Sequence, residues 1–277
     1  MSTIRLGGVG RAVAGMMMLV TGSAFAAPQF NMPYGVTNVS HDIYDLHMMM
    51  LWICVAIGVV VYGVMAWSII RHRKSKGAVP AQFHESTTVE IIWTIIPFLI
   101  LLGAAIPSSI VLIKTYHTGN PKMVVKITGY QWMWHYSYPD QKIAFYSKLA
   151  QSSEDARELG SKVNVFKVPH YLRNVDHPLV LPIHTRVKFL ITSKDVIHSW
   201  WVPDLGIKKD AIPGYINTDW TNINKPGVYR GQCAELCGRG HAYMPIVVRA
   251  VTRAKFKQWV AKEQQKPQQH MLKRTED

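Results

Sequence analysis

The chain has few acidic residues, few cysteines and no motif for covalent haem attachment. It contains 17 Asp and Glu against 31 Lys and Arg, which gives a net charge of +14, and only 3 cysteines in 277 residues. No Cys-x-x-Cys-His is present, so we expect no haem on this chain. A positive charge of this size is typical of proteins that meet nucleic acid, anionic lipid or an acidic partner. No nucleic-acid module is recognisable, so we expect no nucleic-acid partner.

Residues 1–26 are typical of a secretory signal peptide. Arg5 and Arg11 make a basic start, residues 12–20 form a short apolar core, and residues 24–26 match the Ala-x-Ala cleavage pattern. A retained first membrane helix is the alternative, but the apolar core is too short to span a bilayer. No cysteine follows the cleavage position, so nothing indicates a lipid anchor.

Two uncharged apolar stretches predict a transmembrane hairpin over residues 48–113. The stretches cover residues 48–70 and 91–113, and each exceeds the roughly 20 residues that a bilayer core requires. The loop at residues 71–76 is strongly basic, which places it in the cytoplasm by the positive-inside rule. We therefore expect a two-pass protein of a bacterial inner membrane. Residues 27–47, the chain after Lys114 and both termini would lie on the periplasmic side.

After the second apolar stretch the pattern changes to short strands. Candidate strands lie at residues 123–129, 186–192, 227–232 and 245–251, bounded by Pro and Gly. Many short strands predict a β-sandwich or barrel, here assigned to residues 114–264. Within this domain, residues 138–182 form a polar insertion in which we expect loops and one helical turn. Residues 252–264 have the spacing of an amphipathic helix, and residues 265–277 read as a polar, disordered tail.

A compact group of metal-binding residue types lies near the C-terminus, at Cys233, Cys237, His241 and Met244. Thiolate and thioether ligands favour copper, and imidazole is compatible with it. A structural zinc site would need a second ligand pair, whereas His198 is the one further candidate. A second cysteine is surplus for one copper ion but suits two ions that share two thiolates. The alternative is a disulfide between the two cysteines, with ordinary His and Met residues around it.

The metal-binding pattern resembles that of a known family. Cys-x-Glu-x-Cys-Gly-x-x-His-x-x-Met, preceded by Asp-Val-x-His-Ser-Trp at residues 195–200, is similar to the binuclear copper A motif of cytochrome c oxidase subunit II. The similarity extends from about Asp42 to about Trp259. It implies an all-β, cupredoxin-like Greek-key domain after the two-helix hairpin. The metal-binding loop would join the last two strands.

The resemblance also implies a ligand set. The copper A ligands would be the side chains of His198, Cys233, Cys237, His241 and Met244 and the main-chain carbonyl of Glu235. The carboxylate of Glu235 would in addition reach a magnesium ion shared with subunit I. Cys54 lies in the middle of the first apolar stretch with no partner at hand, and we expect it to fill space there.

Two further residues correspond to functional positions of the family. Trp132, in the aromatic stretch at residues 129–136, matches the tryptophan that accepts electrons from the donor. Period-two alternation would place it on one strand face with Trp134 and Tyr136. Glu90, in Glu-x-Ile-Trp-Thr, matches a glutamate at the mouth of a proton channel of subunit I. A solvated carboxylate at a helix start is the alternative interpretation of Glu90.

The resemblance implies an electron-relay subunit of a haem-copper terminal oxidase, with subunit I and also subunit III as partners. A periplasmic carrier would deliver electrons, and haem a and oxygen reduction would belong to subunit I. The alternatives are a quinol oxidase subunit II, whose relatives lack these ligands, the copper A subunit of another membrane reductase, and a membrane-tethered copper carrier or assembly factor.

The chain departs from the family where the donor docks. Ser137 and Lys194 stand where the family often has acids, and Tyr215 stands where it tends to have arginine. The net charge beyond residue 113 is +12. A strongly basic donor would be repelled by such a surface, so we predict a neutral or acidic carrier.

Overall fold

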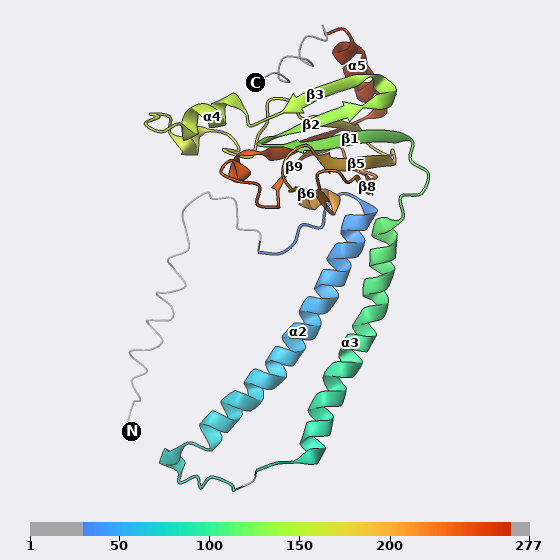
Figure 1. The fold of residues 1–277 in the computed structure, drawn as a ribbon. Coiled ribbons are helices and arrows are strands. Elements are labelled where there is room, and N and C mark those ends of the chain that lie inside the picture. Colours follow the sequence, from blue (N-terminus) through green and yellow to red (C-terminus); the bar gives the residue numbers. More distant parts are fainter. Residues whose placement is uncertain (1–29, 83, 267–277) are drawn as a thin grey trace, which may run out of the picture. The chain divides into compact units, whose positions relative to one another are not determined.

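A computed structural model describes residues 30–82 and 84–266 (Figure 1). The predicted signal peptide and nearly all of the predicted polar tail lie outside these residues. Within them, the chain forms a pair of long helices followed by a β-sandwich, which confirms the expected fold class.

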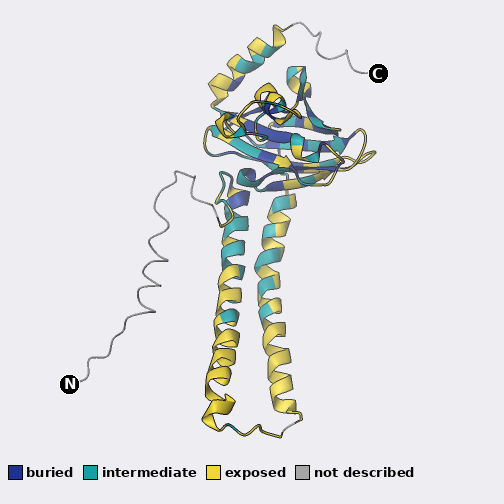
Figure 2. Cartoon of the chain, turned by 90° about the vertical axis from the view of Figure 1, so that its left-hand side faces the viewer, coloured by how far each residue is buried: buried dark blue, intermediate teal, exposed yellow. Residues whose placement is uncertain are grey.

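The helical hairpin consists of α2 (Asn38–Arg71) and α3 (Thr87–Tyr116), and both helices are long and apolar enough to cross a membrane. Their apolar side chains are largely exposed, as expected for a surface that meets lipid rather than a protein core (Figure 2). α2 begins with a capping box, in which Thr37 and Ser40 satisfy each other's backbone N–H groups. The basic loop between the helices contains a short 3₁₀ turn, η1 (Lys74–Lys76).

The sandwich consists, within the described residues, of two five-stranded sheets with the orders β3-β2-β1-β5-β8 and β4-β10-β9-β6-β7. The strands are β1 (Met123–Tyr130), β2 (Met133–Tyr138), β3 (Ile143–Ser147), β4 (Leu179–Pro182), β5 (Val187–Ser193), β6 (His198–Val202), β7 (Ile207–Ala211), β8 (Asn217–Thr221), β9 (Gly227–Cys233) and β10 (Pro245–Val251). β1 pairs with β5 and β4 with β10 in parallel, and the other pairs are antiparallel. All four predicted strands are present within one or two residues of the predicted bounds.

The core lies between the two sheets and is rich in aromatic residues. On β2 the alternate residues Trp134, Tyr136 and Tyr138 are fully buried. Trp200 of β6 lies against Phe189 of β5 from the opposite sheet, with ring centroids 5.3 Å apart. The part of the aromatic stretch that lies in β2 is therefore in the core, as its alternation predicts.

The prediction for Trp132 is wrong in one respect. β1 ends at Tyr130 and β2 begins at Met133, so Trp132 lies in the turn between them and not on the buried face of β2. The period-two pattern starts only after the turn, because a turn reverses the chain and breaks the alternation.

The insertion at residues 138–182 contains more structure than its polar composition indicates. It includes the predicted helical turn as α4 (Gln151–Arg157), but also the edge strands β3 and β4, which we did not predict. β4 is a short run that is buried on both faces and shows no alternation, which makes it hard to recognise from sequence. The C-terminal helix α5 (Arg253–Gln264) is present as expected, with Phe256 and Trp259 packed against the core.

Candidate metal centre

The candidate ligands lie on two neighbouring strands and the loop that follows one of them. Cys233 is the last residue of β9, and the metal loop (residues 233–244) leads from it to Pro245 at the start of β10. His198 is the first residue of β6, which pairs with β9 through Trp200 and Cys233. The sheet therefore brings His198 to a loop that is far from it in sequence.

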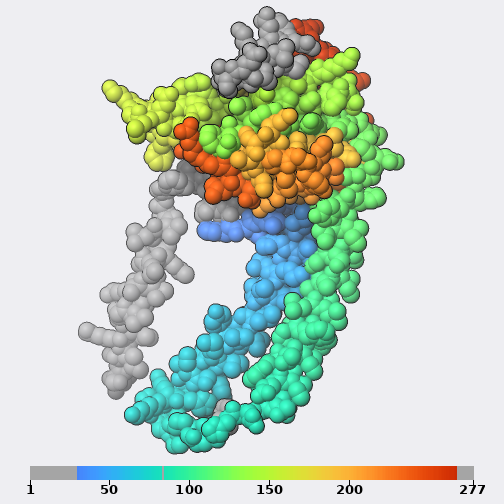
Figure 3. Space-filling model, viewed as in Figure 1, coloured from blue at the N-terminus to red at the C-terminus, as the bar shows by residue number. Residues whose placement is uncertain are grey.

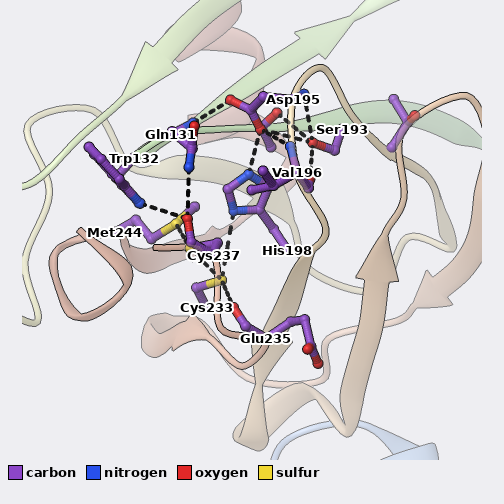
Figure 4. A network of polar contacts seen from close by, with 12 residues as sticks. Gln131, Trp132, Ser193, Asp195, Val196, His198, Cys233, Glu235, Cys237 and Met244 are labelled. Atoms are coloured by element: carbon purple, nitrogen blue, oxygen red, sulfur yellow. Dashed lines mark hydrogen bonds and ion pairs between the residues drawn. The ribbon is translucent and has the colours of Figure 1, made fainter. Parts of the chain in front are cut away.

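Two buried sulfur atoms occupy the middle of the site. Cys233 Sγ lies 3.9 Å from Cys237 Sγ and 4.0 Å from His198 Nδ1 (Figure 4). The ligand atoms of these three residues all lie within 4.8 Å of one another. In the described part of the chain both cysteines are free thiols, and their separation is almost twice the roughly 2.05 Å of a sulfur–sulfur bond. The structure thus contains a thiol pair and not the alternative disulfide.

The remaining predicted ligands surround the sulfur atoms. Cys237 Sγ lies 3.6 Å from His241 Nδ1 and 3.4 Å from Met244 Sδ. The carbonyl oxygen of Glu235 lies 3.3 Å from Cys233 Sγ, whereas the exposed Glu235 carboxylate points away from the sulfur atoms (Figure 4). The structure therefore places one imidazole beside each thiol, with a thioether and a carbonyl close by.

This arrangement of ligand atoms fits soft metal ions. Two sulfur atoms 3.9 Å apart can both reach one ion at a metal–sulfur distance of about 2.3 Å, and both can bridge a pair of ions. Thiolate, imidazole and thioether together are ligands that copper prefers, whereas magnesium and calcium prefer oxygen. The chemistry of the residues present therefore fits a copper centre.

Asp195 holds His198 in position. Its Oδ1 atom lies 2.8 Å from His198 Nε2 and accepts the N–H of Val196, while its Oδ2 accepts the N–H of Gln131 at 2.6 Å. Burial raises the pKa of Asp195, but the hydrogen bonds from His198, Val196 and Gln131 outweigh it, so the pKa lies below its ordinary value. An ionised Asp195 thus occupies one ring nitrogen of His198 and turns the other toward Cys233.

The two thiols influence each other's ionisation. Burial raises the pKa of Cys233, but hydrogen bonds from His198 and from backbone groups outweigh it and lower the pKa to about 7. Burial and the charge of the neighbouring Cys233 thiolate raise the pKa of Cys237 to about 12. Without a cation between the sulfur atoms, the pair therefore ionises once and resists the second ionisation.

Trp132 contacts the metal loop directly. Its indole Nε1 and the side-chain amide of Gln131 both donate to the carbonyl oxygen of Cys237, at 3.0 and 2.9 Å. The ring lies over Gly240, where a β-carbon would overlap the indole. The half-buried Trp132 thus contacts the backbone of Cys237, the residue that carries one of the two sulfur atoms. A turn, and not a strand, holds Trp132 in this position.

The metal loop also contacts the insertion. The guanidinium of Arg157 in α4 lies 4.3 Å from the ring centroid of Tyr243 in η5 (His241–Tyr243). In Figure 3 the red-orange segment that includes the metal loop lies at the surface next to the yellow-green segment that includes α4. The site is therefore close to the surface, although its sulfur atoms are buried.

Comparison with known proteins shows the family. Residues 123–251 match the family described as cytochrome c oxidase subunit II, periplasmic domain, and residues 26–111 match the transmembrane domain of the same subunit. The chain belongs to the cytochrome c oxidase subunit II family. It is accordingly subunit II of a haem-copper oxidase and a two-pass membrane protein, and the family implies copper A at the site described above.

Named relatives agree with this family. The chain is 40% identical over 223 residues to the probable cytochrome c oxidase subunit 2 of Rickettsia prowazekii, which covers 80% of this chain and 68% of the relative. It is 39% identical over 232 residues to the mitochondrial cytochrome c oxidase subunit 2 of Glycine max, over 81% of this chain and 56% of the relative.

Two solved structures are also similar. One is the periplasmic domain of subunit II of cytochrome oxidase of Bradyrhizobium japonicum, with 38% identity, a TM-score of 0.46 and coverage of 53% of this chain and 96% of that chain. The other is a mixed disulfide intermediate between a thioredoxin-like protein and a subunit II of cytochrome c oxidase. It has 36% identity, a TM-score of 0.42 and coverage of 52% and 92%.

The remaining predicted residue of subunit II, Glu90, lies away from the metal loop in sequence and in structure. It occupies the first turn of α3, where its N–H bonds to the Ser86 carbonyl and its carbonyl accepts the Thr94 hydroxyl. Its side chain is exposed, which fits either a proton-exchange role or a simple helix-start carboxylate.

Asp195, Gln131 and Gly240 contribute to the site in ways that sequence reasoning missed. Asp195 accepts the N–H of Val196, as a turn-capping carboxylate does, but it also orients His198. Its position three residues before a candidate histidine ligand is a usable signal, because metal-binding histidines commonly bond a carboxylate through the second ring nitrogen. Gln131 and Gly240 carry no comparable signal, since their roles depend on a contact between distant segments.

Proposed function

We propose that this subunit relays single electrons through a binuclear copper A centre to haem a of subunit I. The observation that carries the proposal is the pair of buried thiols 3.9 Å apart, with His198 beside one sulfur atom and His241 beside the other. The ligands would be His198, Cys233, Cys237, His241, Met244 and the carbonyl of Glu235. Bound copper would supply reversible one-electron uptake shared between two ions.

The protein's own residues would keep this site ready for rapid electron transfer. The two cysteines would supply bridging thiolates, and Asp195 would hold the ring of His198 so that its Nδ1 stays directed at the site. Met244 and Trp134, which lie in the sandwich core, exclude water from one side of the sulfur atoms. His198 and Cys233 are fixed on two paired strands and so move little, and small movement favours electron transfer.

We propose Trp132 as the residue through which electrons arrive. Its indole contacts the metal loop through Cys237 and Gly240, and it lies close to the surface on a turn. An apolar ring with one bonded N–H suits a brief contact with a soluble periplasmic carrier.

The donor would be a neutral or acidic carrier, because Lys194 and Ser137 replace acids and the domain is strongly basic. Added salt should then slow the reaction with an acidic donor, because screening weakens attraction. A basic cytochrome c that reacts faster at low salt than at high salt would contradict this assignment.

The orientation in the membrane, the partner subunits and the roles of Glu90 and Glu235 are proposed from the family and from the distribution of charged residues. The basic loop at residues 71–76 would face the cytoplasm of a bacterium and the sandwich the periplasm, after removal of residues 1–26. Subunit I, and with it subunit III, would be the partners in the membrane. Glu90 would lie at the mouth of a proton channel of subunit I. The Glu235 carboxylate would reach a magnesium ion shared with that subunit, since it is exposed and points away from the thiols.

Electron paramagnetic resonance combined with a copper count on the full chain in detergent tests the proposal. After copper loading, we expect two copper ions per chain and a hyperfine pattern from two equivalent nuclei that share one unpaired electron. A pattern from a single copper nucleus would favour a copper carrier or assembly factor. Copper uptake with a Cys233–Cys237 disulfide intact would overturn the thiolate-bridged site.

A further inference from the structure

An open pocket lies where α3 ends and the chain leads into the β-sandwich. Its volume is about 660 Å3, and it is lined by Tyr116, His117, Thr118, Gly119, Asn120 and Arg186. Five of these residues are consecutive and follow the apolar part of α3 directly, while Arg186 immediately precedes β5. None of them belongs to the metal centre or to the proposed electron route.

The guanidinium of Arg186 is held in a defined orientation. Its Cζ atom lies 3.9 Å from the ring centroid of Trp220, which is half-buried on β8. Gly119 also lies against it, and a β-carbon at that position would overlap the guanidinium. A guanidinium stacked on its flat face keeps its N–H groups available along the edge, and that edge is the part that binds a carboxylate or phosphate in bidentate fashion.

Positive charge is in excess at this position. Within residues 30–82 and 84–266, no carboxylate lies at ion-pair distance from Arg186. The neighbouring Lys209, whose ammonium lies 4.5 Å from the ring centroid of Tyr116, is by contrast paired with Asp219 at 3.9 Å, so the unpaired charge is that of Arg186. The half-buried Arg186 therefore faces an open pocket with its charge unpaired by any carboxylate of the described residues, and an anion that enters the pocket can pair with it.

The pocket is tied to the end of the membrane span. The indole Nε1 of Trp220 donates to the carbonyl oxygen of Thr115, in the last turn of α3, at 3.0 Å. The apolar stretch of α3 ends at Ile113, so the residues from Tyr116 onward reach the level of the lipid headgroups. Tyr and Trp side chains are enriched at this level because their rings are apolar and their polar groups reach water.

We propose that this pocket binds the phosphate group of an anionic phospholipid, with the Arg186 guanidinium as its bidentate donor. Free phosphate offers the same acceptor atoms, but a pocket at the end of a membrane span meets lipid headgroups at far higher local concentration. A zwitterionic lipid would bring its own cation next to Arg186, and like charges repel. The site therefore selects for headgroups with a net negative charge.

Native mass spectrometry of the full chain in detergent tests this proposal. The chain is titrated with phosphatidylglycerol, with phosphatidylcholine, or with phosphatidylglycerol in the presence of inorganic phosphate. We expect phosphatidylglycerol to bind more tightly than phosphatidylcholine, with little competition from phosphate. Arg186→Gln should weaken phosphatidylglycerol binding by roughly tenfold or more, since it removes a charge-assisted pair. Arg186→Lys should retain part of the affinity, because lysine keeps the positive charge but cannot donate two parallel hydrogen bonds to one phosphate.

Arg249→Gln is the matched control, because Arg249 is exposed on β10 and lies outside the pocket. It removes the same charge and should leave lipid binding unchanged, and thermal unfolding of each variant checks that the fold is intact. Equal losses in Arg186→Gln and Arg249→Gln would overturn the site, as would equal binding of both lipids to the original chain. Full displacement by inorganic phosphate would overturn the lipid assignment and identify a site for soluble anions.

Discussion

His198 Nε2 lies 2.8 Å from Asp195 Oδ1, and this contact turns the other ring nitrogen, Nδ1, toward the sulfur atom of Cys233. The carboxylate is itself fixed by two backbone N–H groups, from Gln131 and Val196. The turn before β2 and the segment before β6 thus meet at one carboxylate. The orientation of a ligand on β6 therefore depends on a residue that touches no sulfur atom.

Replacement of this carboxylate should weaken the metal site without removing a ligand. We expect Asp195→Ala to lower copper affinity by roughly 10- to 100-fold, because the ring of His198 loses its orienting partner. Competition with a chelator of known affinity measures the change. Asp210→Asn, at an exposed position on β7, is the control and should leave affinity unchanged. Equal affinities for the original chain and Asp195→Ala would show that the strand alone orients His198.

The two thiols of the loop should differ in function from the third cysteine. We expect Cys233→Ser and Cys237→Ser each to abolish the signal of coupled copper ions, because a hydroxyl is a poor ligand for copper at neutral pH. Cys54→Ser is the matched control, since Cys54 is exposed on α2 and lies far from the loop in sequence. Copper content and paramagnetic resonance distinguish the variants. A coupled signal that survives in Cys237→Ser would contradict the bridging role.

Gly240 should matter because of the indole that lies over it. In Gly240→Ala the new β-carbon would overlap the ring of Trp132 and displace it from the loop. We expect electron delivery from the donor to slow by roughly 10- to 100-fold while copper content stays near normal, since no ligand is changed. Stopped-flow reduction of the copper-loaded protein measures the rate. Gly103→Ala on α3 makes the same chemical change where no side chain lies within 4 Å, and it should have no effect.

Asp219 should make stability depend on pH. Burial raises its pKa to about 6, although the Trp220 N–H and Lys209 act in the opposite direction. The folded protein therefore binds a proton more tightly than the unfolded chain does. The contribution of this group to the free energy of unfolding is greatest below about pH 3, falls by about 3 kcal/mol in total as pH rises through the folded-state pKa, and is constant above about pH 7.

Asp219→Asn should remove this dependence, because the amide resembles the protonated carboxyl. We expect the variant to be more stable than the original chain by about 1–3 kcal/mol at pH 7.5 and similar to it near pH 4. Unfolding of the metal-free chain, followed by tryptophan fluorescence at several pH values, measures the difference. An unchanged slope between pH 4 and pH 6 in Asp219→Asn would mean that the buried carboxyl is not responsible.

The hydrophobic pattern predicted the two long helices and four inner strands, but it missed the edge strands and also β6, an inner strand that carries His198. Long uncharged stretches are sufficient to identify α2 and α3, and alternation such as that of Val187, Phe189 and Ile191 identifies β5. β3 and β4 were missed because edge strands are short, and because β4 is buried on both faces and shows no alternation. β3 and β4 are held in the strand conformation by backbone pairing with β2 and β10, and this pairing cannot be recognised from their own sequences.

The sequence by itself determined the chemistry of the candidate site. Cysteine, histidine and methionine at close spacing define which ions can bind, because the softness of a ligand belongs to its atoms and not to the fold. Only the tertiary structure decided how these atoms are held. The contacts of Asp195 with Gln131, of Trp132 with Gly240 and of Arg186 with Trp220 join segments that are distant in the chain. Such contacts depend on how the strands pair and where the turns end, and no local pattern of residues encodes them.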